Sequence, residues 1–340
     1  MPLPQLDFKA SEAARAALAM IGRTEDVRFS PDNKLLAIAG FGRHRCLILR
    51  IEIERTAAGP AVAIGDFMEL TSDGIGDVHG LDFLDDRTLV TANRDGLVSI
   101  VRLPSGELAG RRCSVEADRH LRGGIFCRLE TPGSVAVRHE PRGLASLLVC
   151  NNYTHQVTRH LIRSGPPYRV WRNQVLLRQG LIIPDGIALS HDGRWIAVSS
   201  HGTNDIKIFD ASAALGPSTL PAGVLRSANY PHGLRFTNDD RHIVVADAGS
   251  PELYVYDRGE DWRGPRDPSR RIRVLDDETF HRGRANIEEG GPKGLDIDRS
   301  NTVVAVTCEE QSLAFYPLAS IVGKQPRISG ALALTGQLRG

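Results

Sequence analysis

A short pattern of apolar and polar positions recurs six times along the chain. Each copy has a strand of alternating apolar residues, a polar turn such as SPDN, SHDG or TNDD, and then a second apolar run. The copies begin at residues 25, 79, 133, 185, 232 and 293, and a third strand such as CLILRIEI or ELYVYDR follows each. A period near 50 residues, with three clear strands and a weaker fourth, is typical of β-propeller blades.

Six such repeats fill most of the chain, and a seventh would need about 50 more residues. The sequence therefore predicts an all-β fold, a six-bladed propeller of four-stranded blades over residues 25–340. The fourth strands are expected at VAIGDFMEL, LAGRRCSV, YRVWRNQVLL, AGVLRSA and RRIRVLD. Residues 328–336 are expected to add the missing outer strand of blade six or blade one.

Two segments stand apart from the repeats. Residues 1–24 are an N-terminal extension, in which 11–21 should form a helix outside the propeller because its apolar residues share one face. Before the sixth repeat lies a charged insertion rich in Pro and Gly, 259–291. We expect it to form one strand and a long loop over the mouth where Lys293 begins its strand, since long loops in compact domains are often functional lids.

The first position of each repeat begins the innermost strand and should face one mouth of the central channel. The six residues there are Glu25, His79, Gly133, Asp185, His232 and Lys293, and all of them except Gly133 are ionisable. Two carboxylates and two imidazoles can together hold a divalent metal ion. Polar residues at a wet channel mouth can also be purely structural, so both interpretations stay open.

A second polar ring follows the second apolar run of each repeat. Its loops would adjoin the first ring and could contact a sugar-like or carboxylate ligand, with Arg94 as the anion contact. Asn and Asp are also ordinary turn residues, which is the alternative interpretation. The ring contains Asn93, Arg94, Asn151, Asn152, Ser200, His201, Asp247, Cys308 and Glu309.

Composition narrows the class of protein. Lys and Arg total 42 and Asp and Glu total 41, a net charge of +1 that argues against a nucleic-acid partner. The apolar runs are too short to cross a membrane, and the N-terminus does not resemble a secretory signal. The five cysteines are widely spaced without CxxC, so we expect reduced thiols in a cytoplasmic protein.

The repeats at 184–210 and 231–257 resemble the senescence-marker-protein, gluconolactonase and lactone-hydrolase propellers. That family carries P-N-G-L or P-D-G-L motifs, and here the matching segments are Pro184-Asp185-Gly186 and Pro231-His232-Gly233. Seven-bladed lactonase and cytochrome-type propellers share similar repeats, but the count of six argues against them.

The resemblance implies one divalent metal in the channel. The family's first-blade Glu corresponds to Glu25, its Asn to Asp185 and its Asp to His232, with His79 as a fourth ligand not expected from the family. Imidazole ligands move the preference from calcium toward zinc, manganese or iron. We therefore expect a metal-dependent hydrolase of a lactone or related small ester, with a small-molecule substrate.

In this hypothesis Asp185 or a histidine acts as general base, and Lys293 or Arg94 stabilises the oxyanion. The GxSxG, HExxH and GxxxxGK[ST] motifs are missing from the sequence. A lyase or isomerase using the same ring remains open, as does a non-catalytic propeller that binds a partner protein or ligand. The substrate, the metal and the oligomeric state are not determined by the sequence.

Overall fold

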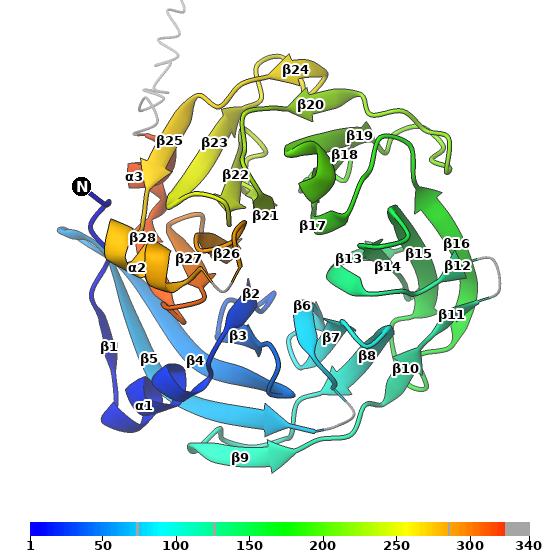
Figure 1. Ribbon diagram of the computed structural model, residues 1–340. Coiled ribbons are helices and arrows are strands. Elements are labelled where there is room, and N and C mark those ends of the chain that lie inside the picture. Colours follow the sequence, from blue (N-terminus) through cyan, green and yellow to red (C-terminus); the bar gives the residue numbers. More distant parts are fainter. Residues whose placement is uncertain (73–74, 125–126, 285, 324–340) are drawn as a thin grey trace, which may run out of the picture.

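The computed structural model describes residues 1–323 except 73–74, 125–126 and 285. Six blades surround a central axis in this part of the chain (Figure 1). Each innermost strand begins one residue before the predicted repeat start, so the six-bladed propeller is confirmed. These strands are β2 (Thr24–Phe29), β6 (Val78–Asp85), β13 (Pro132–Glu140), β17 (Pro184–Leu189), β21 (Pro231–Phe236) and β26 (Pro292–Ile297).

The remaining strands follow outward in antiparallel order within each blade. Blade one adds β3 (Leu35–Gly40), β4 (Arg45–Thr56) and β5 (Gly59–Thr71), and blade two adds β7 (Thr88–Asn93), β8 (Leu97–Arg102) and β10 (Arg119–Leu121). Blade three adds β14 (Leu144–Asn151), β15 (Gln156–Arg163) and β16 (Val170–Leu177), and blade four adds β18 (Trp195–Ser200), β19 (Asp205–Asp210) and β20 (Gly223–Leu225). Blade five adds β22 (His242–Asp247), β23 (Glu252–Asp257) and β25 (Arg270–Arg273), and blade six adds β27 (Val303–Cys308) and β28 (Ala314–Pro317).

Four of the five predicted fourth strands lie in their expected blades, as β5, β16, β20 and β25. The assignment of LAGRRCSV to blade two is wrong. Its strand β9 (Arg111–Ser114) instead pairs in parallel with β5 of blade one, where Met68 lies opposite Arg111. The edge of the 13-residue strand β5 is covered in this way, and β10 completes blade two.

The N-terminal segment packs against the outside of the propeller. Strand β1 (Phe8–Ala10) pairs with β5, and the backbone N–H of Leu6 donates to the Phe315 carbonyl at 2.8 Å. Helix α1 (Glu12–Met20) confirms the predicted helix, and the Ser11 hydroxyl caps it by accepting from the Ala14 N–H. The predicted outer strand at 328–336 lies outside the described residues.

The insertion before blade six contains more regular structure than expected. Besides β25 it holds β24 (Gly264–Arg266), which pairs in parallel with β20, and the short helix α2 (Asp277–Arg282). The Asp276 carboxylate caps α2 by accepting from the Thr279 N–H at 2.7 Å. A helix of six residues is too short to show a clear apolar period in the sequence.

Smaller elements complete the described chain: the hairpin β11 (Gly123–Gly124) with β12 (Cys127–Arg128), the 3₁₀ turn η1 (His201–Thr203) and helix α3 (Leu318–Val322). None of the helices in the described residues is long and apolar enough to span a bilayer.

Close approach of the inner strands explains the glycine in the repeated P-x-G motif. A Cβ added to Gly186 would lie 2.1 Å from the carbonyl oxygen of His232 in the next blade, and one added to Gly233 would lie 2.5 Å from that of Lys293. Both distances are shorter than van der Waals contact, so any larger residue would push the blades apart. The glycine of this motif is therefore required by the close packing of inner strands around the axis. The same packing brings the residue before each glycine next to its counterparts in neighbouring blades.

Replacement of Phe8 tests the role of the N-terminal segment. The Phe8 ring packs edge-on against Phe315 of blade six with centroids 5.4 Å apart, while β1 pairs with blade one. Because the ring is half-buried, we expect Phe8→Ala to lower the free energy of unfolding by about 2 kcal/mol in urea titrations. Lys9→Ala, an exposed position on the same strand, should change it by less than about 0.5 kcal/mol. Equal effects of the two substitutions would contradict this account.

Candidate functional site

Five ionisable side chains meet at one mouth of the channel. Each is the second residue of an innermost strand, and each is at most 5% exposed: Glu25, His79, Asp185, His232 and Lys293. They come from five different blades, so only closure of the propeller brings them together (Figure 1). The convergence expected from the repeat register is therefore present in the structure.

The two carboxylate oxygens of Glu25 have different surroundings. Oε1 lies 3.2 Å from the Lys293 ammonium and also pairs with the Arg23 guanidinium. Oε2 lies 3.4 Å from Nε2 of His232 and 3.6 Å from Nε2 of His79, but accepts no hydrogen bond from the described residues. Burial alone would raise the pKa of Glu25, but Lys293 and the His232 imidazole outweigh burial and hold it well below its usual range.

Asp185 is held in a similar way. Its Oδ1 accepts from the Asn152 amide at 2.8 Å and from the Arg94 guanidinium at 3.4 Å. Its Oδ2 lies 3.1 Å from Nε2 of His232 and 3.8 Å from Nε2 of His201, again without a hydrogen bond from the described residues. Burial opposes ionisation, but His232 and Arg94 keep the pKa of this carboxyl far below normal. Asp185 is therefore ionised at neutral pH.

The contacts of His79 fix its tautomer. Its Nδ1–H donates to the Gly133 carbonyl oxygen at 2.8 Å, so Nε2 carries the lone pair and accepts from Arg94 at 2.7 Å. Burial and the Arg94 charge lower the pKa of His79 to about 3, which leaves it neutral. At His232, burial is outweighed by Asp185 and Glu25, which raise its pKa. The site thus contains one neutral imidazole and one that readily takes a proton.

Gly133 is the sixth member of the ring and its only position without a functional side chain. Its carbonyl orients His79, and a Cβ at Gly133 would lie 2.6 Å from both Asn152 Oδ1 and Asp185 Oδ1. The missing side chain therefore makes the space in which Asp185 and Asn152 meet.

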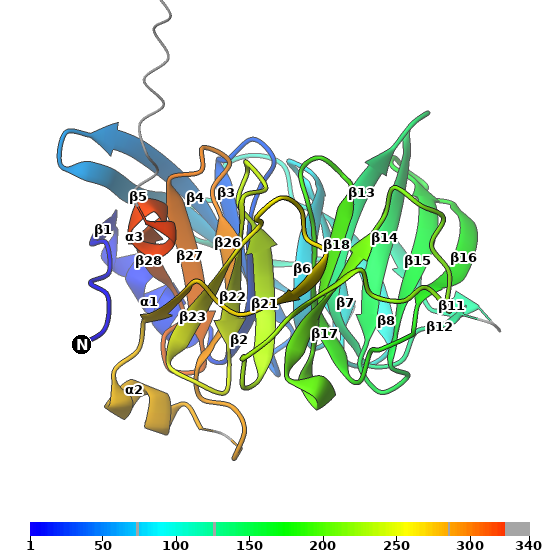
Figure 2. The ribbon, with the colours of Figure 1, turned by 90° about the horizontal axis from the view of Figure 1, so that it is seen from above.

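Charged residues outside the ring enclose Lys293. Its ammonium lies 2.6 Å from Glu289 and 3.6 Å from Glu309, and Arg23 pairs with the same two carboxylates. Glu289 belongs to the insertion, so part of that segment does lie over the mouth near Lys293; α2 is seen on this face in Figure 2. Arg23 and Glu289 were missed because neither occupies a position that repeats from blade to blade.

Six residues of the second ring divide into two groups. Arg94 and Asn152 contact Asp185, and His201 lies beside it while stacking on the Tyr230 ring at 3.9 Å between centroids. The other three residues bond within their own blades: Asn93 donates to Ser99 Oγ, Asn151 donates to Thr158 Oγ1, and Asp247 accepts from the backbone of Asn229 and Tyr230. These three side chains hold turns and do not join the cluster.

The donor set fits a small divalent ion. Glu25 Oε2, His79 Nε2 and His232 Nε2 all lie within 4.8 Å of one another. Ligands about 2.1 Å from a tetrahedral ion lie about 3.4 Å apart, which is close to the measured separations from Glu25 to the two imidazoles. A void of about 10 Å³, the size of one water molecule or ion, is lined by these residues and Asp185. The His79 Nδ1–H bond to a carbonyl is also the usual support of a ligating imidazole.

Comparisons with known proteins agree with the fold. A family described as a seven-bladed β-propeller lactonase matches residues 183–275, which contain β17 to β25 in blades four and five. A solved luciferin-regenerating enzyme aligns with a TM-score of 0.55 and 12% identity over 86% of this chain and 91% of its own. At this identity the likeness shows the shared fold alone. No curated protein matches the chain significantly. The resemblance to lactone-hydrolase propellers is thus confirmed, and the described blades number six rather than seven.

Adding a methyl group at Gly133 tests the packing of the site. Gly133→Ala should displace Asp185 or Asn152 and lower the free energy of unfolding by about 1–3 kcal/mol. Gly165→Ala is the matched control, because a Cβ there meets nothing within 4 Å. Urea unfolding of both variants gives the comparison, and indistinguishable midpoints would rule out the crowding inferred at Gly133.

The buried histidine His201 predicts a pH dependence. Burial lowers its pKa to about 4, against 6.5 in an unfolded chain, with Asp185 partly opposing the shift. Between these values the unfolded chain binds a proton that the folded protein does not, so stability present above pH 6.5 is lost as the pH falls toward 4. From pH 7 to 5, wild type should lose about 2 kcal/mol more than His201→Gln. Chemical denaturation with EDTA present measures this difference, and parallel pH profiles would refute the prediction.

Proposed function

We propose that the protein is a hydrolase of a lactone or related small ester and that the cluster at this channel mouth is its active site. The observation that carries the proposal is the buried convergence of two carboxylates and two imidazoles from four blades, in which two carboxylate oxygens accept no hydrogen bond from the described residues. Perturbed ionisable groups that converge in this way are typical of catalytic sites. The lactonase family match over residues 183–275 supports the same class of reaction.

Glu25, His79 and His232 would hold a divalent ion, with Asp185 as a neighbouring or fourth ligand. Two imidazoles in the set favour zinc, manganese or iron over calcium. Such an ion would polarise a carbonyl group and lower the pKa of a bound water. Arg94 donates to the Nε2 lone pair of His79 that an ion would use, and its side chain is 25% exposed, so it is placed to move aside toward solvent.

The protein's own residues have separable roles in this proposal. Asp185 takes the proton of the attacking water through Oδ2, while Asn152 fixes its orientation through Oδ1. Arg94 is the cation placed to stabilise the oxyanion, because it is partly exposed at the mouth. Lys293 is enclosed by three carboxylates, so its role is to keep Glu25 ionised rather than to contact the substrate.

Metal content and hydrolysis measured on the same variants test the proposal. Purified protein is incubated separately with zinc, manganese, iron or calcium, and bound metal is measured by elemental analysis after desalting. A panel of lactones is then followed by acid release. Wild type should bind about one ion per chain, whereas Glu25→Gln should lose the ion. Asp185→Asn should lower the rate of hydrolysis by about 100-fold or more.

The matched control is His160→Asn. His160 is a fully buried histidine of blade three, bonded to Thr158 and Asn173 away from the site, so this variant should keep both metal and activity. Hydrolysis by protein without bound metal would contradict the metal dependence but would still support a hydrolase. Failure of every lactone to react with metal-loaded protein would favour a binding propeller instead, and reaction without water uptake would indicate a lyase or isomerase.

A further inference from the structure

A second cavity lies at the opposite mouth of the channel. It has a volume of about 570 Å³, within the range of small-molecule sites. Its walls come from the far ends of the inner strands and from the turns that follow them, such as 191–193 in blade four. The residues of the proposed active site occupy the starts of the same strands, so the two sites face opposite sides of the propeller. This second cavity has no role in the hydrolase proposed above.

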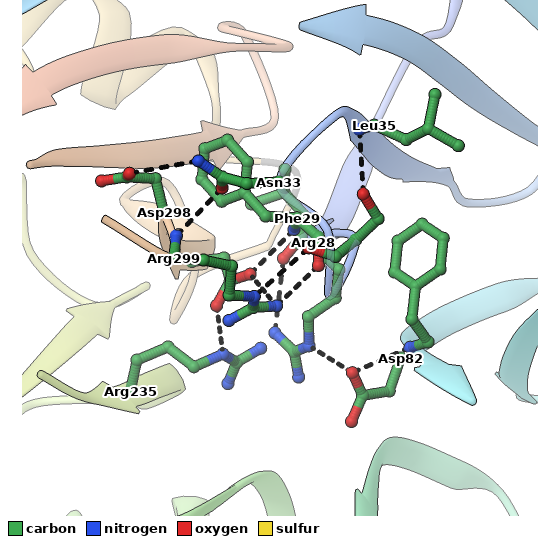
Figure 3. A network of polar contacts seen from close by, with 12 residues as sticks. Arg28, Phe29, Asn33, Leu35, Asp82, Arg235, Asp298 and Arg299 are labelled. Carbon is green, nitrogen blue, oxygen red and sulfur yellow. Dashed lines mark hydrogen bonds and ion pairs between the residues drawn. The ribbon is translucent and has the colours of Figure 1, made fainter. Parts of the chain in front are cut away.

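The cavity is shaped by another position of the repeat, the fifth residue of each innermost strand. In chain order these residues are Arg28, Asp82, Ala136, Ala188, Arg235 and Asp296. The charged residues from blades one, two, five and six gather on one side, whereas the two small alanines leave the other side open. Figure 3 shows the Arg28 and Arg235 side chains extending toward the same region from β2 and β21, the strands on either side of β26.

The carboxylates of this cavity already have donors. Asp82 accepts from the backbone N–H of Val137 at 2.8 Å, which ties blade two to blade three. Asp296 accepts from the N–H of Phe29 at 2.8 Å, which ties blade six to blade one, and also from Arg235 Nε at 3.0 Å. These acidic groups are therefore occupied in holding the blades together.

The cations, in contrast, retain unused donors. The guanidinium nitrogen Nη2 of Arg235 is buried and donates no hydrogen bond to the described residues. Its ion-pair partner Asp26 lies 3.5 Å away. Among the described residues, the ion-pair partner of Arg138 is Glu140, at 3.8 Å from Nε, which is beyond hydrogen-bond distance. Each guanidinium carries five N–H donors and no acceptor. The cavity therefore offers surplus donors and would be complemented by an acceptor-rich group.

The open side of the cavity is apolar. Ala136 of blade three and Ile187 and Ala188 of blade four line it, across the axis from Arg28 of blade one. A ligand that fills the cavity must therefore present acceptors on one side and an apolar surface on the other. Both features occur in small organic acids and in phosphate esters.

We propose that this cavity binds a small organic anion. Its carboxylate or phosphate group faces Arg28, Arg235 and Arg138, and its apolar body lies against Ala136, Ile187 and Ala188. An anionic group in this position accepts charge-assisted hydrogen bonds, which are stronger than those between neutral groups.

Three probes of similar size test the proposal: benzoate, phenyl phosphate and the neutral benzamide. Saturation-transfer NMR and calorimetric titration should detect binding of one or both anions, which also tells whether a carboxylate or a phosphate is preferred. Benzamide should bind at least tenfold more weakly. Equal affinity for benzamide, or binding of none of the three probes, would overturn the proposal.

Two variants locate the binding. Ala188→Leu fills the apolar side of the cavity without changing any charge. Arg138→Gln removes a cation, and because the Arg138 side chain is 39% exposed, its replacement should not prevent folding. Each should weaken anion binding about tenfold or more. Glu25→Gln, at the other mouth, should bind the anion as wild type does, so failure of the hydrolase proposal leaves this one intact. Unchanged affinity in both Ala188→Leu and Arg138→Gln would place the anion elsewhere and refute the assignment.

Discussion

Charge neutralisation along the propeller axis is the constraint on which the rest of the structure depends. Six inner strands converge there, and their second and fifth residues include buried Glu, Asp, Lys, Arg and His side chains. A buried charge costs several kcal/mol unless it is paired and hydrogen-bonded. Lys293 is paired with Glu25 across the junction of blades six and one, and Arg235 with Asp296 across that of blades five and six. The same interactions that neutralise the axis therefore close the ring.

Buried charges are compensated in different ways at the two ends of the axis. At the far mouth, backbone N–H groups and arginines use the acceptor capacity of Asp82 and Asp296, so these carboxylates join the blades. At the near mouth, one oxygen each of Glu25 and Asp185 accepts no hydrogen bond from the described residues, although both groups are ionised. Carboxylates left partly unpaired in a buried site are costly for stability, which is why we assign function to the near mouth.

Much of the architecture could be predicted from the sequence because a propeller repeats its pattern in register. The spacing of Glu25, His79, Asp185, His232 and Lys293 along the chain is enough to predict their place on the inner strands. The same spacing also holds for Arg28, Asp82, Arg235 and Asp296, so the charged lining of the second cavity also follows the repeat in the sequence.

Other features depend on contacts that do not recur from blade to blade and therefore leave no periodic pattern in the sequence. Glu289 reaches Lys293 from an insertion, and β9 crosses from the chain of blade two to the edge of blade one. The role of Gly133 could not be predicted from its residue type. It acts through its carbonyl oxygen and through the space left by the missing side chain. The division of the chain at residue 24 and the cytoplasmic location stay predictions.

Anomalous diffraction from crystals grown with manganese or zinc tests the central claim most directly, because it locates an ion without assuming a substrate. The account predicts one strong peak on the propeller axis, about 2.0–2.2 Å from Glu25 Oε2 and from Nε2 of His79 and His232. It also predicts that Arg94 no longer donates to His79. A peak at another place, or no peak while Arg94 still holds His79, would contradict a metal centre formed by closure of the ring.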